Sequence, residues 1–146
     1  MKINGSQLLR ATRKRVWFIL SDGDCLARAL PGCEEFTETS PCCFEVLLKL
    51  GVAGIKGTYR GRIRLDQQVE HESFRMTVDG KGVTGFIRGV GDIVLEDHDE
   101  GIQVNYTGDI QVGGTLAAVG QRLVRSGARI VIGQFFLALM QIVEDH

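Results

Sequence analysis

The sequence has few of the residues that divide a chain and no excess of either charge. Its 146 residues include only two prolines, Pro31 and Pro41, so no proline-rich linker separates one segment from another. Seventeen Lys and Arg against 18 Asp and Glu give a net charge of -1, which argues against nucleic-acid binding. We therefore expect a single domain over residues 1–146, with no nucleic-acid partner.

Metal-ligand patterns are also missing. The cysteines form no C-x-x-C pair, and the histidine nearest to them in sequence is His71, so the spacing matches no zinc site and we expect no metal or other cofactor. The run 16–20 is too short for the apolar core of a secretory signal. We therefore expect a cytoplasmic protein in which all four cysteines are free thiols: Cys25, Cys33, Cys42 and Cys43.

Long hydrophobic runs are absent as well. The longest uncharged stretch near the end of the chain, Ile130 to Val143, has 14 residues and contains two glutamines. A membrane-spanning helix needs roughly 20 apolar residues. The sequence therefore predicts a soluble protein.

What is present is one clear strand followed by a long apolar helix. Residues 102–112 alternate between apolar and polar side chains, which is the period of a half-buried strand. From Thr115 to Ala138 apolar residues and glycines recur at three- and four-residue steps, the pattern of one helix face. Gly113, Gly120 and Gly127 lie seven residues apart, so we expect a smooth flank that either packs closely against a sheet or borders a bound molecule.

The rest of the chain predicts one strand and two short helices before several more strands. Residues 2–9 read as a strand, and Thr12 is placed to cap a first helix. Asp22 or Asp24 is placed to cap a second helix that runs through Leu30 and is stopped by Pro31-Gly32. Alternating segments then follow, which we interpret as strands separated by glycine turns: 44–50, 58–66, 74–78 and 86–96. The order favours an α+β fold in which a curved antiparallel sheet wraps around the last helix.

Four segments together resemble the CoxG family of carbon monoxide dehydrogenase subunits, a branch of the START-like helix-grip superfamily. They are Leu30-Pro31-Gly32-Cys33, the glycine-rich run 51–61, Gly80-Lys81-Gly82, and the run 111–117. The resemblance covers residues 1 to about 139. It implies a seven-stranded antiparallel sheet gripping the C-terminal helix around a cavity, no known catalytic set, and association with a molybdenum-containing dehydrogenase at the inner face of the membrane.

The inward positions of the predicted strands and helix suit an apolar ligand, such as a lipid or a quinone-like molecule. Tyr59 and Tyr106 are the predicted polar anchors. The full set of predicted ligand-binding residues is Phe44, Val46, Tyr59, Ile63, Met76, Tyr106, Ile110, Leu116, Gly120, Leu123 and Gly127.

Two other functions remain open at this point. One is a docking subunit without ligand, in which the stripe of Arg60, Arg62 and Arg64 or the last helix contacts a partner; the same stripe also reads as a solvated outer face. The other is a cyclase- or hydrolase-like enzyme, but we assign no catalytic residue, because His71, His98 and His146 lie in polar turns or at the terminus.

The stretch Ile130 to Val143 is apolar on nearly every side. A helix of this kind has to be covered. Besides the sheet, we expect a partner, a second copy of the chain as a homodimer, or a peripheral contact with a membrane surface to cover part of it, and Phe136→Glu is the variant that tests this.

Overall fold

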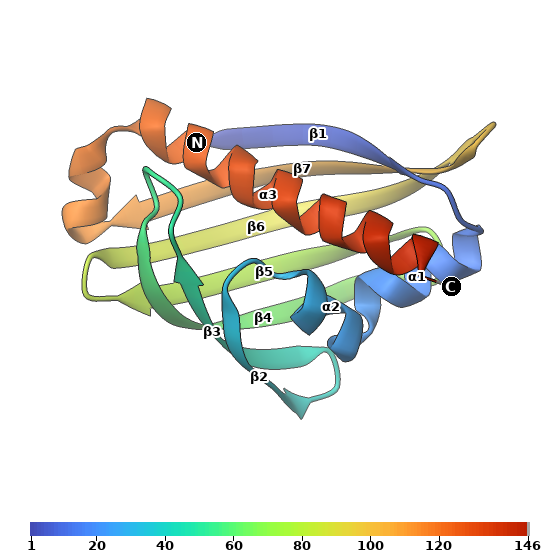
Figure 1. Ribbon diagram of the computed structural model, residues 1–146, viewed down its shortest axis with the longest axis horizontal. Helices are drawn as coiled ribbons and strands as arrows, with labels where there is room; N and C mark the ends of the chain where they lie inside the picture. The colour runs from blue at the N-terminus through green and yellow to red at the C-terminus, as the bar shows by residue number, and fades with distance from the viewer. Residues whose placement is uncertain (146) are drawn as a thin grey trace.

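The computed structural model describes residues 1–145; His146, which closes the predicted domain, lies outside the described residues. The fold is α+β, with a curved seven-stranded antiparallel sheet and a long helix across its concave face (Figure 1). The strands run in the order β1-β7-β6-β5-β4-β3-β2. Their bounds are β1 Lys2–Leu9, β2 Cys33–Ser40, β3 Cys43–Leu50, β4 Gly57–Val69, β5 Ser73–Gly82, β6 Gly85–His98 and β7 Gly101–Gly113.

Two short helices follow β1, as the sequence predicted, and they lead into β2, which it did not predict. The Thr12 hydroxyl accepts a hydrogen bond from the Arg15 amide at 3.3 Å and caps α1 (Arg13–Ser21). The Asp22 carboxylate accepts one from the Cys25 amide at 3.1 Å and caps α2 (Gly23–Ala29). These bonds satisfy amides that the first turn of a helix leaves without a partner.

The last helix is shorter than its apolar period indicates. Residues Gly114–Val119 form a separate 3-10 helix, η1, and α3 runs from Gln121 to Glu144. Gly120 lies between them with φ +100°, a conformation that side chains disfavour and that no α-helix contains. The prediction of one helix from Thr115 onward was therefore wrong, because the apolar spacing continues across a backbone break.

The hydrophobic core forms two clusters on the concave side of the sheet. The larger cluster joins α1, α2 and the second half of α3 to the strands and includes Leu20, Val104 and Leu139. The smaller one lies where α3 begins and includes Leu50, Tyr59 and Val124. This division leaves room between the clusters, beneath the middle of α3.

The sheet and α2 cover only one side of α3. Phe136, Leu139 and Ile142 are buried, so Phe136→Glu would disturb the core and does not test the outer side of the helix. Leu123, Ile130 and Leu137 recur every seven residues on the other side and stay exposed, Leu137 by 65%. By length and composition α3 qualifies as a candidate membrane span, contrary to what we expected from the sequence. The core helix of a soluble protein passes the same test, and here α3 packs on the sheet and α2.

Candidate functional site: an apolar cavity

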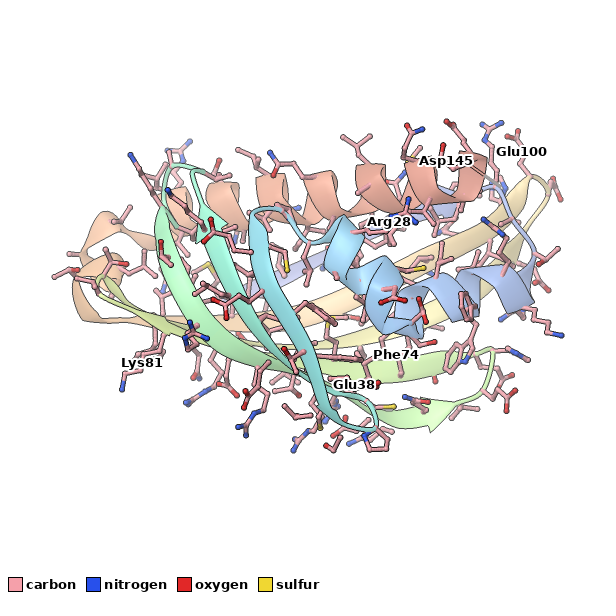
Figure 2. All side chains as sticks on the ribbon, turned by 60° about the horizontal axis from the view of Figure 1, so that its bottom comes forward. Arg28, Glu38, Phe74, Lys81, Glu100 and Asp145 are labelled. Carbon is pink, nitrogen blue, oxygen red and sulfur yellow. The ribbon has the colours of Figure 1, made fainter. Side chains whose placement is uncertain are left out.

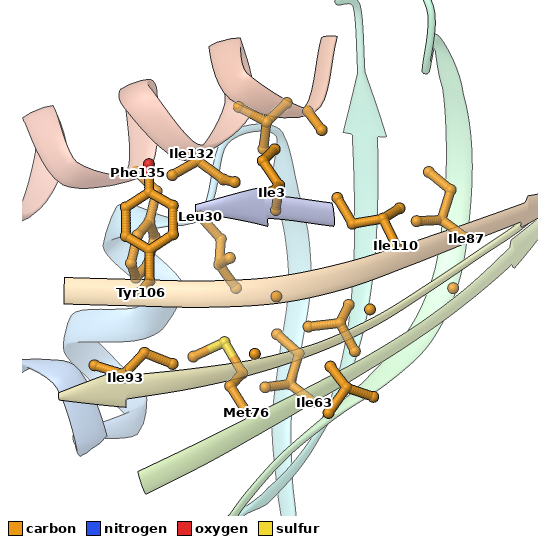
Figure 3. A pocket seen from close by; sticks show the side chains of 18 of the residues that line it. Ile3, Leu30, Ile63, Met76, Ile87, Ile93, Tyr106, Ile110, Ile132 and Phe135 are labelled. Atoms are coloured by element: carbon orange, nitrogen blue, oxygen red, sulfur yellow. The ribbon is translucent and has the colours of Figure 1, made fainter. Parts of the chain in front are cut away.

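A cavity of about 300 Å³ lies between the concave face of the sheet and α3. Its floor is formed by strands β4 to β7 and its roof by α3, with Ile3 of β1 and Leu30 at the end of α2 on its sides (Figure 3). The atoms that line it are almost entirely apolar, and it is partly open to solvent. Ligand pockets in proteins typically measure about 300 to 1,000 Å³, so the space suits a small apolar molecule.

The floor is hollow because four inward positions of the sheet carry no side chain. Gly80, Gly89, Gly91 and Gly108 all line the cavity. Gly91 pairs with Gly108 in β7, so two neighbouring positions are bare. A Cβ built on Gly91 meets nothing closer than the Thr107 carbonyl oxygen at 3.6 Å. The missing side chains therefore create the cavity.

This role of glycine differs from the one we expected. We interpreted the glycines as turns between strands, yet the β5–β6 and β6–β7 registers run without a shift through Gly89 and Gly91. The signal was present, since both glycines fall at alternating, inward positions of the predicted strand 86–96.

Five of the predicted ligand-binding residues line the cavity: Tyr59, Ile63, Met76, Tyr106 and Ile110. Six do not. Phe44 and Val46 point inward as predicted but are buried in the larger core cluster, where the Phe44 ring packs on Phe36 at a centroid distance of 5.0 Å. α2 covers this part of the sheet, since a Cβ on Gly23 would lie 3.2 Å from the Phe44 ring.

The other four lie in η1, at the Gly120 break and in the first half of α3. Leu116 is buried in the smaller cluster and Leu123 is exposed. Gly120 faces open space, whereas a Cβ on Gly127 would lie 2.6 Å from the Ala53 carbonyl oxygen. Gly127 therefore allows close packing of α3 against the β3–β4 loop, which is one of the two roles that we considered for the glycine flank. The other role, in which the flank borders a bound molecule, does not agree with the structure, because neither Gly120 nor Gly127 lines the cavity.

The two tyrosines differ in how their hydroxyl groups are used. The buried Tyr59 hydroxyl donates to the Ile55 carbonyl oxygen at 2.9 Å, so its hydrogen-bonding capacity serves the fold. The Tyr106 ring stacks on Phe136 at a centroid distance of 5.6 Å. Within residues 1–145 its hydroxyl has no hydrogen-bond partner. Of the two predicted anchors, Tyr106 alone keeps a free polar group beside the cavity.

Nothing in the described lining resembles a catalytic set. The lining residues include no His, Cys, Ser, Lys, Arg or Glu among residues 1–145. Asp109 contributes to the wall, but its carboxylate is engaged by the Met1 ammonium group at 2.9 Å and by Lys2 at 3.1 Å. These two contacts lower the pKa of Asp109, so it stays ionised and is not available as a general acid.

Thiols and histidines lie elsewhere. Burial, with a hydrogen bond to Asp22, raises the pKa of Cys25 to about 11. All four cysteines are free thiols. The His98 ring accepts a hydrogen bond from the Glu100 amide at 3.1 Å within the β6–β7 turn, which is a structural role. In the part of the chain that is described, no three His, Cys, Asp or Glu side chains come together as metal ligands.

The arginine stripe on the outer face of the sheet is ion-paired. Arg60, Arg62 and Arg64 each lie within 3.5 Å of a carboxylate, from Glu35, Glu45 and Asp66 respectively. The stripe therefore reads as a solvated outer face of paired charges, which is one of the two interpretations that the sequence left open.

The chain matches one family model and is similar to several proteins of known structure. The family model for CoxG, a subunit of carbon monoxide dehydrogenase, matches residues 5–143. A conserved protein from Geobacillus kaustophilus has a crystal structure that is 30% identical, with a TM-score of 0.94 over 99% of this chain and 96% of that one. No functionally curated protein matches.

More distant structures share the fold alone. A START superfamily protein from Mycobacterium smegmatis is 11% identical, with a TM-score of 0.77 over 99% of this chain and 97% of that one. A protein from Chromobacterium violaceum is 17% identical, with a TM-score of 0.74 over 98% of this chain and 96% of that one. The fold predicted from the sequence, a START-like helix grip, is confirmed.

Proposed function

The chain belongs to the CoxG family of carbon monoxide dehydrogenase subunits, and on that premise we propose that it is a non-catalytic accessory protein that holds an apolar small molecule in its cavity. The observation that carries this proposal is the hollow floor of the sheet at Gly89, Gly91 and Gly108. A protein interior normally fills such space, because each unfilled volume costs stability. A cavity maintained by glycines on the floor of the sheet is instead suited to a guest.

The lining limits the chemistry of that guest. With almost no polar surface in the walls, the bound part has to be apolar, as in a lipid chain or a quinone-like ring. The free Tyr106 hydroxyl, which lies at the α3 side of the cavity (Figure 3), provides one hydrogen bond for a carbonyl or hydroxyl oxygen. We propose this hydroxyl as the one polar anchor.

The family match supports a proposal for the partner. We propose that the protein assists a carbon monoxide dehydrogenase-type molybdenum enzyme in the cytoplasm. Its apolar ligand would be either a molecule that it delivers to that enzyme or an electron carrier for it. Co-purification of the dehydrogenase subunits with a tagged form of this protein tests the association separately from ligand binding.

The ligand is tested by native mass spectrometry and by titration with 1-aminoanthracene, a neutral aromatic probe. We expect a co-purifying apolar molecule, or saturable probe binding at one site. In Gly91→Leu the added side chain fills the floor between Met76 and Gly108, and we expect binding to fall at least tenfold.

Gly133→Leu is the matched control. Gly133 is exposed on α3 and a Cβ there has no neighbour within 4 Å, so the same substitution leaves the cavity unchanged. Equal probe affinity in Gly91→Leu and wild type, or no bound molecule and no probe binding in the wild type, would refute the proposal.

A further inference from the structure

The outer side of α3 is exposed along its length. Leu123, Ile130 and Leu137 lie seven residues apart on this side and are exposed by 45%, 47% and 65%. In Figure 1 the helix crosses in front of the sheet with no other element over it, and in Figure 2 it forms the upper edge of the molecule. A row of large aliphatic side chains along a helix is typical of a surface that packs against another helix.

Gly133 lies between Ile130 and Leu137 on the same side, and nothing within residues 1–145 uses the space left by its missing side chain. The residue is exposed, and a Cβ built on it meets no atom within 4 Å. Gly127, in contrast, gives room to the Ala53 carbonyl oxygen. Because glycine destabilises the interior of a helix relative to alanine, an exposed glycine here is best explained by close contact with a second molecule.

The first and last turns of α3 carry opposite charges. Arg122 in the first turn and Glu144 in the last are both exposed, and neither has an ion-pair partner among residues 1–145. Asp145 lies 3.9 Å from Arg28, and Figure 2 shows both at the same end of the helix. Arg15 donates to a backbone carbonyl oxygen of α3 at 3.2 Å. At this end Glu144 therefore keeps an available carboxylate.

We propose that the outer side of α3 forms the interface of a homodimer, in which two copies of the helix pack antiparallel. Ile130 of each copy then packs on the bare surface at Gly133 of the other, and Arg122 of each copy lies beside Glu144 of the other. Both contacts form together, because each pair of residues is centred near position 132 of the helix. A surface that matches itself across a two-fold axis is the usual form of a dimer interface.

Charge favours the antiparallel arrangement. In a parallel pair, Arg122 and Arg129 would each lie beside their own copies, and like charges in contact oppose association. With a length of about 36 Å, one pair of these helices buries less than about 1,200 Å², which is the lower end for stable complexes. We therefore expect a dissociation constant in the micromolar range.

The dimer leaves the cavity as it is in one copy. Ala128, Ile132 and Phe135 line the cavity from the other side of α3, whereas Ile130 and Gly133 do not line it. Association therefore joins two cavities through their roofs and does not fill either of them.

Sedimentation velocity of the purified protein, from about 1 to 200 μM, measures the dimer fraction across the expected dissociation constant. We expect this fraction to rise with concentration in the wild type. Ile130→Glu should weaken the dimer by about tenfold or more, because it places a charge at the centre of the contact. Gly133→Leu should weaken it as well, because the added side chain holds the two helices apart.

Charge reversal tests the orientation. Arg122→Glu should weaken the dimer about fivefold, because each dimer contains two of these ion pairs. Combining it with Glu144→Arg restores both pairs in reversed form, so the double variant should dimerise like the wild type. A double variant as weak as Arg122→Glu alone would overturn the antiparallel dimer.

Val69→Glu is the matched control. Val69 is exposed by 49% at the end of β4 and is not part of α3, so this variant should dimerise like the wild type. A monomer at every concentration, or a dimer that Ile130→Glu leaves intact, would overturn the proposal. A protein that stays monomeric and loses binding to lipid vesicles in Ile130→Glu would assign this side of α3 to a membrane instead.

The cavity provides an independent readout. Ile130→Glu and Gly133→Leu should both bind 1-aminoanthracene as the wild type does, because neither residue lines the cavity. Failure of the dimer and failure of ligand binding are therefore distinguishable.

Discussion

The two tyrosines of the cavity show how the same side chain serves the fold at one position and remains free at another. We predict that Tyr59→Phe lowers the free energy of unfolding by about 1 to 2 kcal/mol, because it leaves the buried Ile55 carbonyl oxygen without its donor. Tyr106→Phe should leave stability nearly unchanged, because its hydroxyl has no partner within residues 1–145. Urea unfolding measures both.

Ligand binding should show the opposite pattern to stability, with an effect in Tyr106→Phe and none in Tyr59→Phe. Affinity for an apolar ligand that carries a carbonyl or hydroxyl group should fall in Tyr106→Phe, and affinity for a pure hydrocarbon should not. Tyr59→Phe should keep both affinities. A Tyr106→Phe variant that binds the two kinds of ligand as the wild type does would rule out Tyr106 as the polar anchor.

At Cys25 burial suppresses reactivity. Because its pKa is raised to about 11, only about one thiol in a thousand is ionised at pH 8, and the thiolate is the reactive form. We predict that iodoacetamide labels Cys25 only after unfolding, which peptide mass spectrometry detects. Labelling of Cys25 in the native protein as fast as Cys43, which is only half-buried, would contradict this.

The raised pKa of Cys25 also makes the stability of the protein depend on pH. Between pH 9, the ordinary value for this thiol, and about pH 11, the unfolded chain loses the Cys25 proton and the folded chain retains it. Stability therefore falls as the pH rises through this window, and Cys25→Ala should remove that part of the decrease.

Within the helix α3, alanine substitutions at two glycines should change the stability in opposite directions. Gly133→Ala should stabilise the protein by about 0.5 to 1 kcal/mol, because the site is open and alanine favours the helix. Gly127→Ala should destabilise it by about 1 to 3 kcal/mol, because the new methyl group meets the Ala53 carbonyl oxygen. Thermal unfolding of the two variants measures this difference, and stabilisation by both would show that the β3–β4 loop moves aside freely.

Local patterns predicted the elements whose causes are local. Side-chain caps at Thr12 and Asp22 start α1 and α2, and alternation located β3 to β7. The strand β2 escaped notice, because an edge strand with almost no buried side chain carries no apolar alternation. The break at Gly120 was also not predicted, because the three- and four-residue spacing of Leu116, Val119 and Leu123 in the sequence continues across it.

The cavity could be predicted only in part, for a reason that concerns packing between distant elements. Alternation identifies which side chains point to the concave face, and it did so for Phe44 and Met76 alike. Whether an inward side chain meets a helix or an open space depends on where α2 and α3 cross the sheet. No segment of the sequence encodes that position by itself, so Phe44 became core and Met76 became lining.

An unfilled cavity lowers the stability of the whole domain. A bound ligand and a side chain that fills the cavity should therefore both raise the stability. At about 100 times its dissociation constant, 1-aminoanthracene should stabilise the wild type by about 2.7 kcal/mol. For a domain of this size, that corresponds to a rise in melting temperature of roughly 5 to 10 °C. Differential scanning calorimetry measures the rise directly.

Gly91→Leu should take the place of the guest. Its side chain fills the space that faces Gly108 and replaces a glycine within a strand, so the variant without probe should melt a few degrees above the wild type. The probe should then add almost nothing. A variant that melts below the wild type would show that the floor of the sheet has no room for the side chain. One that is stabilised by the probe as strongly as the wild type would place the bound molecule elsewhere, because the filled floor and the guest cannot occupy the same volume.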